Sequence, residues 1–111
     1  MPVLKSDAHM TTVKEGVQRK LIHAENLMTV VIDFDNGPWT KPDPWHDHVH
    51  EQTTYVASGE ILFFCEGEDQ QHLGAGDMFW VPSGKSHTIQ LLTKNVRLID
   101  SFNPIREEFL K

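Results

Sequence analysis

The sequence predicts an all-β fold of antiparallel strands. Short runs in which apolar and polar residues alternate recur along the 111 residues, and each run ends at a turn signal rich in Gly, Pro, Asn, Asp or Ser. No sustained helical period occurs before the last few residues. Roughly eight or more strands at this spacing fit a jelly roll or a small barrel. A chain of this length buries roughly two thirds of the surface that it exposes when unfolded, so we expect one domain, residues 1–111.

The first half of the chain contains three predicted strands. In the run 28–34, apolar residues alternate with mostly polar ones, and Asn36-Gly37 then closes the strand with residues that tolerate a positive φ. Prolines keep the following loop, 38–44, extended. A long strand is predicted at 45–56, and a turn at Ser58-Gly59 pairs it with a strand at 60–66.

The second half continues the same pattern. A polar turn at 67–69 and the turn 74–77 precede a short strand at 78–81. Pro82-Ser83-Gly84 then bends the chain toward an alternating run at 87–91, and the last long strand covers 96–102. The tail 105–110 is predicted to form one helical turn.

Composition excludes several classes of partner. The net charge of −6 argues against nucleic acid, because binding a polyanion needs a basic surface. Apolar stretches such as 61–65 are far shorter than the roughly 20 residues that span a bilayer, so we expect a soluble, cytoplasmic protein without a membrane partner. Cys65 is the lone cysteine and is expected to fill the core.

The most informative feature is a set of four side chains that suit a metal ion. Side chains two residues apart on a strand project from the same face, about 6.6 Å from one another. His46, His48, His50 and Gln52 of the predicted strand 45–56 should therefore share one face. Neutral imidazoles suit Zn, Cu, Fe and Ni, and an amide carbonyl adds an oxygen donor. We therefore predict one mononuclear divalent transition-metal site, whose ligands are His46, His48, Gln52 and His87.

The other histidines are weighed differently. His50 would share the face of His46 and His48, so contact with the metal or a substrate stays open. His9, His23 and His72 have no such context and are expected at the surface. A solvated strand residue is the simpler explanation for any one histidine, and only the four donors together favour a metal.

The residues around these ligands match two motifs of the metal-binding cupins. The second half of the first motif is His-x-His, three residues, an amide ligand, six residues and Gly, and it runs here from His46 to Gly59. The leading Gly of this motif is missing. The second motif is present as Gly76, Pro82, Gly84 and His87, with Leu91 in place of the final Asn. The chain thus resembles the cupins, which implies the double-stranded β-helix form of the jelly roll. In that pattern His50 is not a ligand position.

Finer features resemble the small uronate-processing cupins of the KdgF type. The matching segments are Glu51-Gln52, Tyr55-Val56, Gly59-Glu60, residues 81–84 and the C-terminal residues 99–110. Cupins of this type open and ketonise the unsaturated uronate monomers that lyases release from pectin or alginate. The resemblance therefore implies a metal-dependent, isomerase-type enzyme with one Ni, Zn, Fe or Mn ion, a small acidic sugar as substrate, and a homodimer.

Two residues near the end of the chain are candidate catalytic groups. Asp100 lies in an otherwise apolar row of strand 96–102, where burial raises a carboxyl pKa and a nearby metal lowers it. Arg106 has the planar fork that suits a carboxylate. The resemblance implies that Asp100 is catalytic and that Arg106 holds the uronate. The alternatives are an aspartate bonded to a backbone turn and an arginine paired with Glu107 or Glu108 at the surface.

Several features leave alternatives open. Trp45, Trp80, Phe64 and Tyr55 are candidates to line a sugar pocket, although a core position is commoner for aromatics in a small β-domain. Trp39, in the proline-rich loop, is a candidate lid or subunit-interface residue. An iron-dependent dioxygenase or a non-catalytic sugar-binding module is also compatible with three histidines in a cupin.

Overall fold

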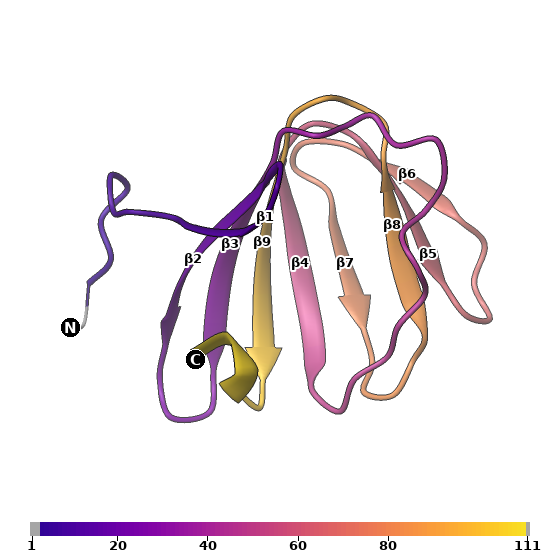
Figure 1. Ribbon diagram of the computed structural model, residues 1–111. Coiled ribbons are helices and arrows are strands. Elements are labelled where there is room, and N and C mark those ends of the chain that lie inside the picture. Colours follow the sequence, from indigo (N-terminus) through magenta and orange to yellow (C-terminus); the bar gives the residue numbers. More distant parts are fainter. Residues whose placement is uncertain (1–2, 111) are drawn as a thin grey trace.

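The computed structural model describes residues 3–110 and confirms an all-β jelly roll, in which two antiparallel sheets face each other (Figure 1). The larger sheet has the order β1-β2-β3-β9-β4-β7, and the smaller has the order β6-β5-β8. Residues 1, 2 and 111 of the expected domain lie outside the described part. The elements are β1 (Thr11–Lys14), β2 (Val17–His23), β3 (Met28–Phe34), β4 (Glu51–Ser58), β5 (Ile61–Cys65), β6 (Gln71–Leu73), β7 (Met78–Val81), β8 (His87–Leu91), β9 (Val96–Asn103) and the 3-10 helix η1 (Glu107–Leu110).

Most predicted strands are confirmed. The strands predicted at 28–34, 78–81 and 87–91 have the predicted bounds. Strand β5 is one residue shorter at each end than predicted, β9 is one residue longer, and η1 supplies the predicted helical turn. Strands β1, β2 and β6 lie outside the predicted runs. The long strand predicted at 45–56 is wrong, because β4 begins only at Glu51.

The reason for this error is that residues 39–46 belong to the other side of the sandwich. The backbone N–H of Trp39 donates to Leu91 O (2.9 Å) and that of Asp43 donates to Ile89 O (3.1 Å), so this segment runs beside β8. The prolines at 38, 42 and 44 cannot donate, so the pairing stays irregular. The chain then crosses from the smaller sheet to the larger one over residues 47–50.

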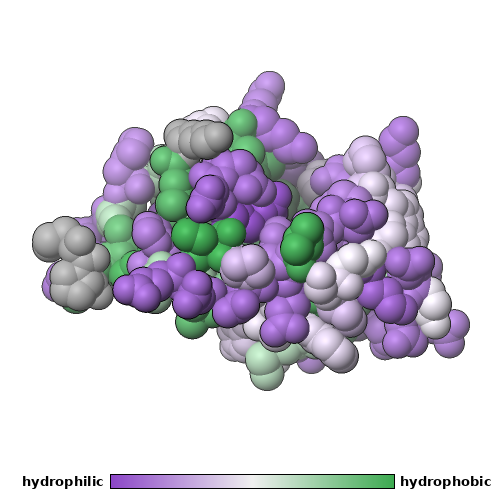
Figure 2. Space-filling model, turned by 90° about the horizontal axis from the view of Figure 1, so that it is seen from below, coloured by the Kyte–Doolittle hydropathy of each residue, from purple (hydrophilic) through white to green (hydrophobic). Residues whose placement is uncertain are grey.

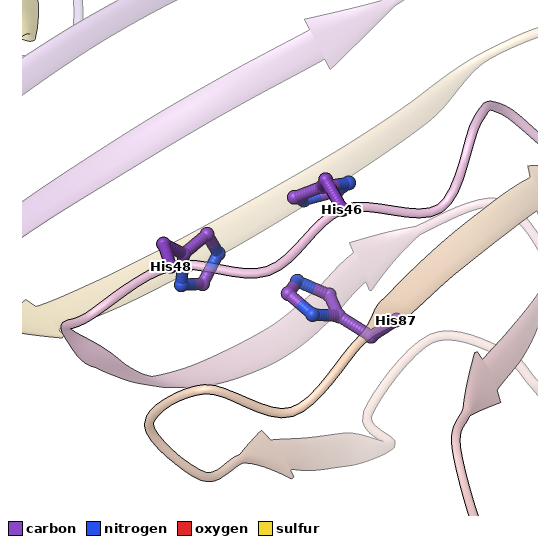
Figure 3. A group of neighbouring side chains, drawn as sticks. All are labelled: His46, His48 and His87. Carbon is purple, nitrogen blue, oxygen red and sulfur yellow. The ribbon is translucent and has the colours of Figure 1, made fainter.

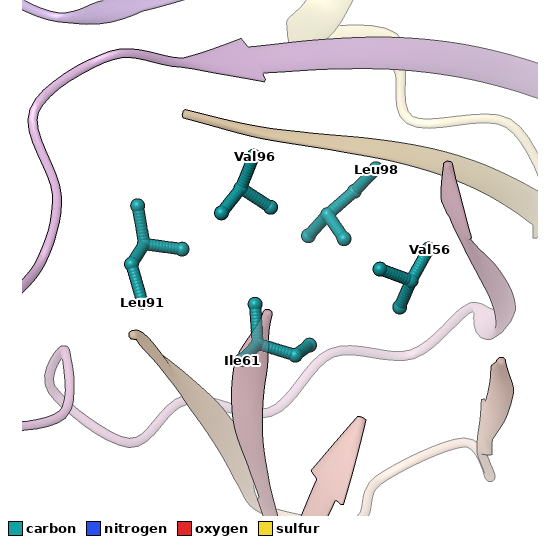
Figure 4. Close-up of a cluster of buried hydrophobic side chains, with 5 residues drawn as sticks. All are labelled: Val56, Ile61, Leu91, Val96 and Leu98. Atoms are coloured by element: carbon teal, nitrogen blue, oxygen red, sulfur yellow. The ribbon is translucent and has the colours of Figure 1, made fainter. Parts of the chain in front are cut away.

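The core lies between the two sheets. Its largest cluster, drawn in Figure 4, gathers side chains from four strands that point toward one another and are at most 4% exposed. Each such side chain stabilises the fold by roughly 1.5–3 kcal/mol relative to exposure. Cys65 is buried beside Phe63 and Val81, which confirms its predicted packing role. The largest cluster contains Val56, Ile61, Leu91, Val96 and Leu98.

Two glycines shape the turns, for different reasons. Gly59 has a φ of 81°, a value that L-residues with side chains rarely adopt, and it closes the β4–β5 turn as predicted. Gly37, in the predicted turn Asn36-Gly37, does not have a positive φ. A Cβ at Gly37 would collide with the carbonyl oxygen of Thr93, so glycine is needed there because two backbones come close together.

The aromatic residues are less buried than expected. Trp45, Tyr55 and Trp80 are 49%, 41% and 61% exposed, so a core position is wrong for these three. Trp45 packs against the half-buried Phe64 with ring centroids 6.1 Å apart. Trp39 packs against the largest core cluster, and its indole N–H donates to Asn36 Oδ1 (3.0 Å).

The C-terminal tail covers a second core cluster. The ring of Phe109 in η1 meets Phe102 of β9 edge-on, with centroids 6.0 Å apart, and the cluster beneath also contains Met28 and Val30. Residues 104–106 are thereby held close to the end of β9 (Figure 1). Among residues 3–110, no helix is long and apolar enough to cross a membrane.

Candidate metal centre

Three of the four predicted metal ligands converge at one end of the sandwich. His46 ends the segment that runs beside β8, His48 lies in the segment 47–50 that crosses between the sheets, and His87 is the first residue of β8. One ring nitrogen from each lies within 4.8 Å of the other two. Figure 3 shows the three rings gathered around a common space. The convergence is as predicted, but it does not arise from alternation along one strand.

Backbone contacts fix the positions of these rings. His46 and His87 form an isolated antiparallel bridge, in which each N–H donates to the carbonyl of the other (3.1 and 2.9 Å). The N–H of Gly84 donates to His48 O (2.9 Å), and the hydroxyl of Ser83 donates to Val49 O. The turn at 82–84 thus fastens the crossing segment beside the start of β8.

Two of the imidazoles are held in the tautomer that leaves Nε2 available to a metal. His87 Nδ1 lies 2.9 Å from Lys85 O, and His48 Nδ1 lies 3.2 Å from His50 O. A carbonyl oxygen only accepts, so each Nδ1 carries the hydrogen and each neutral ring keeps its lone pair on Nε2. Backbone carbonyls commonly orient histidine ligands in this way. Among the described residues, Nε2 of His48 is buried and has no hydrogen-bond partner.

Burial keeps these rings neutral. It lowers the pKa of His87 to about 4 and also lowers the pKa of His48, in each case as the largest cause. Neutral rings present their lone pairs at pH 7 without having to lose a proton. His48 and His87 are thus ready donors, and the three convergent imidazoles are the ligand type that suits a single divalent transition metal.

Gln52, the fourth predicted ligand, is buried near the start of β4. Its amide nitrogen Nε2 donates to Thr54 Oγ1 over 2.8 Å. Because the nitrogen donates to Thr54, the amide carbonyl oxygen is the Gln52 atom that could coordinate a metal. The role of Gln52 as a ligand stays a prediction.

Asp100 occupies the position predicted for it. It is 6% exposed, and it shares the buried face of β9 with Val96, Leu98 and Phe102. The Thr54 hydroxyl donates to Asp100 Oδ1 over 2.7 Å, so the hydrogen-bond partner is a side chain and not the backbone turn of the alternative. Burial raises the pKa of Asp100 to about 6, although the Thr54 hydrogen bond and the charge of Arg106 lower it in part.

Arg106 is anchored beside the site. Its Nε donates to Glu108 Oε1 (2.8 Å), the pairing that one alternative predicted. Its guanidinium also lies over the rings of Phe109 and Phe102, with 4.2 and 5.5 Å to the ring centroids. Phe102 also meets the ring of His50, so the guanidinium lies at the end of the sandwich that carries the histidines. Its positive charge lowers the pKa of Asp100 in part.

His50 stands next to the three convergent histidines without joining them. Its ring stacks on His48 with centroids 3.7 Å apart, and it meets Phe102 edge-on at 4.7 Å. The residue is 6% exposed, and burial is the main cause that lowers its pKa to about 4. Its Nε2 is buried without a hydrogen-bond partner in the described chain. The structure thus places a neutral ring against one predicted ligand.

Sequence reasoning missed Thr54, whose hydroxyl touches both Gln52 and Asp100. A signal was available, because Thr54 falls on the inward-facing row of β4 between Gln52 and Val56. His9, His23 and His72 are exposed as predicted, and His72 pairs with Glu60 over 2.8 Å.

The end of the molecule that carries this group is mostly hydrophilic. Figure 2 views it from below, the end at which β9 finishes and β4 and β8 begin in Figure 1, and apolar patches show between the polar residues. A polar surface of this kind suits a small hydrophilic molecule better than a lipid.

Comparison with known proteins gives the family. The cupin domain model matches residues 31–102. The chain is 35% identical over 98 residues to the pectin degradation protein KdgF of Dickeya dadantii, which covers 86% of each chain. The structure of KdgF from Halomonas sp. superposes with a TM-score of 0.83 at 31% identity and 96% coverage of both chains. An RmlC-like cupin from Shewanella frigidimarina gives a TM-score of 0.83 at 32% identity, with coverage of 96% of this chain and 93% of the other. The chain therefore belongs to the cupin family, and its similarity to KdgF extends over nearly its whole length.

Proposed function

We propose that this chain is a metal-dependent enzyme that opens the ring of 4,5-unsaturated uronate monomers from pectin or alginate breakdown and converts them to the linear ketone. The observation that carries the proposal is that one ring nitrogen each of His46, His48 and His87 lies within 4.8 Å of the other two. The same chain also buries Asp100. The 35% identity to a pectin degradation protein supports the choice of substrate.

Asp100 is proposed as the group that moves the proton. Its carboxylate takes the hydrogen of the anomeric hydroxyl, the electrons of that O–H bond form the C1 carbonyl, and the bond from C1 to the ring oxygen breaks. The electrons of that bond stay on the former ring oxygen and give an enolate, which takes up one proton at C4 and becomes a ketone at C5. A general base works best with a pKa near the working pH, and a pKa of about 6 leaves Asp100 mostly ionised at pH 7.

The three histidines and the carbonyl oxygen of Gln52 would hold one divalent ion, with Ni, Zn, Fe and Mn as the proposed candidates. When bound, such an ion supplies Lewis acidity for the oxygen on which negative charge develops.

Arg106 is proposed to hold the carboxylate of the sugar. A guanidinium binds a carboxylate through two parallel hydrogen bonds. The rings of Phe102 and Phe109 already restrict this side chain, so less conformational entropy is lost when the substrate binds. Local positive charge is needed because the net charge of −6 repels an anionic sugar at longer range.

The test uses the products of a pectate or alginate lyase. The protein should accelerate the loss of ultraviolet absorbance of the C4–C5 double bond, and chelation followed by metal addition should abolish and restore the effect. An unchanged decay rate with the metal-loaded protein would reject the activity. Oxygen consumption would point instead to a dioxygenase, and thermal stabilisation by the sugar without product would point to a binding module.

We also propose that the protein acts as a cytoplasmic homodimer. Tyr55 of β4 and Met78 and Trp80 of β7 alternate with inward-facing residues, and they are exposed on the outer face of the larger sheet. Exposed apolar side chains that gather on one face favour association. Light scattering should give about twice the chain mass of 12.7 kDa, whereas a monomer would reject the dimer. Cell fractionation tests the location.

A further inference from the structure

A buried threonine connects the proposed metal ligand Gln52 with the proposed base Asp100. Gln52 and Thr54 are two apart on β4, and both side chains are buried. Thr54 lies directly opposite Asp100 of β9 in the sheet register. The distances are 2.8 Å from Gln52 Nε2 to Thr54 Oγ1 and 2.7 Å from Thr54 Oγ1 to Asp100 Oδ1.

The two hydrogen bonds can run in only one direction. An amide nitrogen only donates, so the lone pair of the Thr54 hydroxyl receives the hydrogen of Gln52. An ionised carboxylate only accepts, so the hydrogen of the Thr54 hydroxyl points to Asp100. The hydroxyl therefore distinguishes the two ends of the Gln52 amide. It holds the nitrogen toward Thr54 and frees the oxygen, and it occupies Oδ1 of Asp100.

We propose that Thr54 is a positioning residue that sets the amide of Gln52 for metal binding and the carboxylate of Asp100 for proton transfer through one hydroxyl. The catalytic part of this inference rests on the proposed function. The metal-binding part rests only on the proposed ligand set and not on the proposed reaction, because the orientation of Gln52 acts before any substrate binds.

Packing alone does not require a hydroxyl group at position 54. Thr54 is 1% exposed, and valine has nearly the same shape without the oxygen. Valine would leave the amide hydrogen of Gln52 and Oδ1 of Asp100 without this partner inside the fold, where unpaired polar groups are costly. Gln52 would then be free to rotate its amide.

The experiment compares Thr54→Val with Thr54→Ser, which keeps the hydroxyl and loses only a methyl group. The matched control is Thr53→Val, the same change one residue earlier on the exposed face of β4. Zinc affinity of the chelator-treated proteins is measured by competition with a chromogenic chelator. Turnover of lyase products is measured separately as kcat and KM, and circular dichroism checks the fold.

We expect Thr54→Val to weaken zinc binding by about 10–100-fold, the range found when a partner of a metal ligand is removed. Its kcat should fall with KM nearly unchanged, because the base is displaced while Arg106 stays in place. Thr54→Ser should recover most of both properties, and Thr53→Val should match the parent.

The proposal is overturned if Thr54→Val binds zinc as the parent does, or if Thr54→Ser is as impaired as Thr54→Val, because the methyl group would then matter and not the hydroxyl. If Thr54→Val does not fold, Thr54→Ala against Thr54→Ser makes the same comparison. A parent protein that binds zinc but leaves lyase products unchanged would reject the proposed function, while the zinc affinities would still decide the role of Thr54 toward Gln52.

Discussion

Replacing Asp100 with asparagine should separate the stability of this protein from its activity. The carboxylate is 6% exposed, and its ionised form is disfavoured by burial. Asparagine keeps the size of the side chain and an oxygen that can accept the Thr54 hydrogen bond, but it carries no charge. We expect Asp100→Asn to be more stable than the parent at neutral pH and to be inactive.

The size of the effect follows from the pKa. The pKa of Asp100 is about 6 in the folded chain against an ordinary value of 3.8, a rise of about two units. At about 1.4 kcal/mol per unit, ionised Asp100 lowers the free energy of unfolding by about 3 kcal/mol. Because the pKa is raised, the folded chain binds more protons than the unfolded chain between these two values. The destabilisation by ionised Asp100 is therefore fully present above pH 6, shrinks as the pH falls from 6 to 3.8, and is lost below pH 3.8.

The assay is denaturant unfolding of both metal-free proteins at several pH values from 4 to about 7.5. We expect the asparagine variant to be more stable by about 3 kcal/mol at the upper end and by only about 0.5 kcal/mol at pH 4. In metal-loaded samples its turnover of unsaturated uronate should fall by at least about 100-fold, with metal content unchanged. Equal stability at pH 7.5, or a difference that does not shrink toward pH 4, would refute the argument from burial. Retained turnover would refute the role of Asp100 as the base.

Four further outcomes are expected. His87→Ala should lose the bound metal in elemental analysis, whereas His72→Ala, at an exposed histidine, should retain it. Arg106→Gln should reduce kcat/KM for the uronate by about 10–100-fold, mostly through KM, because a charge-assisted hydrogen bond is lost; an unchanged KM would contradict the proposed carboxylate contact. His50→Phe keeps a ring to stack on its neighbour and should leave metal content unchanged, whereas loss of metal would show that the His50 nitrogens take part in binding. Leu91→Ala should lower the free energy of unfolding by about 2–5 kcal/mol in denaturant titration, because it opens a cavity in the largest core cluster.

Much of the fold was predictable because alternation along a strand is a local property. Strands β3 and β9 each turn one row of side chains toward the core, buried along the length of β9 and buried or half-buried in β3, and the sequence places apolar side chains at nearly every second position there. Asp100 breaks the row in β9, which is why it was recognisable as a candidate. The family motifs predicted that His87 meets His46 and His48, although 39 or more residues separate them in the sequence.

The sequence by itself determined the class of fold, the donor atoms available for a metal and the one acid in an apolar row, because each depends on residue type and on spacing within a few residues. Only the tertiary structure decided how these groups meet. His46 and His48 lie where the chain leaves one sheet for the other, so the two-residue period of a strand does not apply to them. The contact between Thr54 and Asp100 joins residues 46 apart in the chain. Such a contact depends on which strands become neighbours in the sheet, and no local pattern of residues encodes that choice.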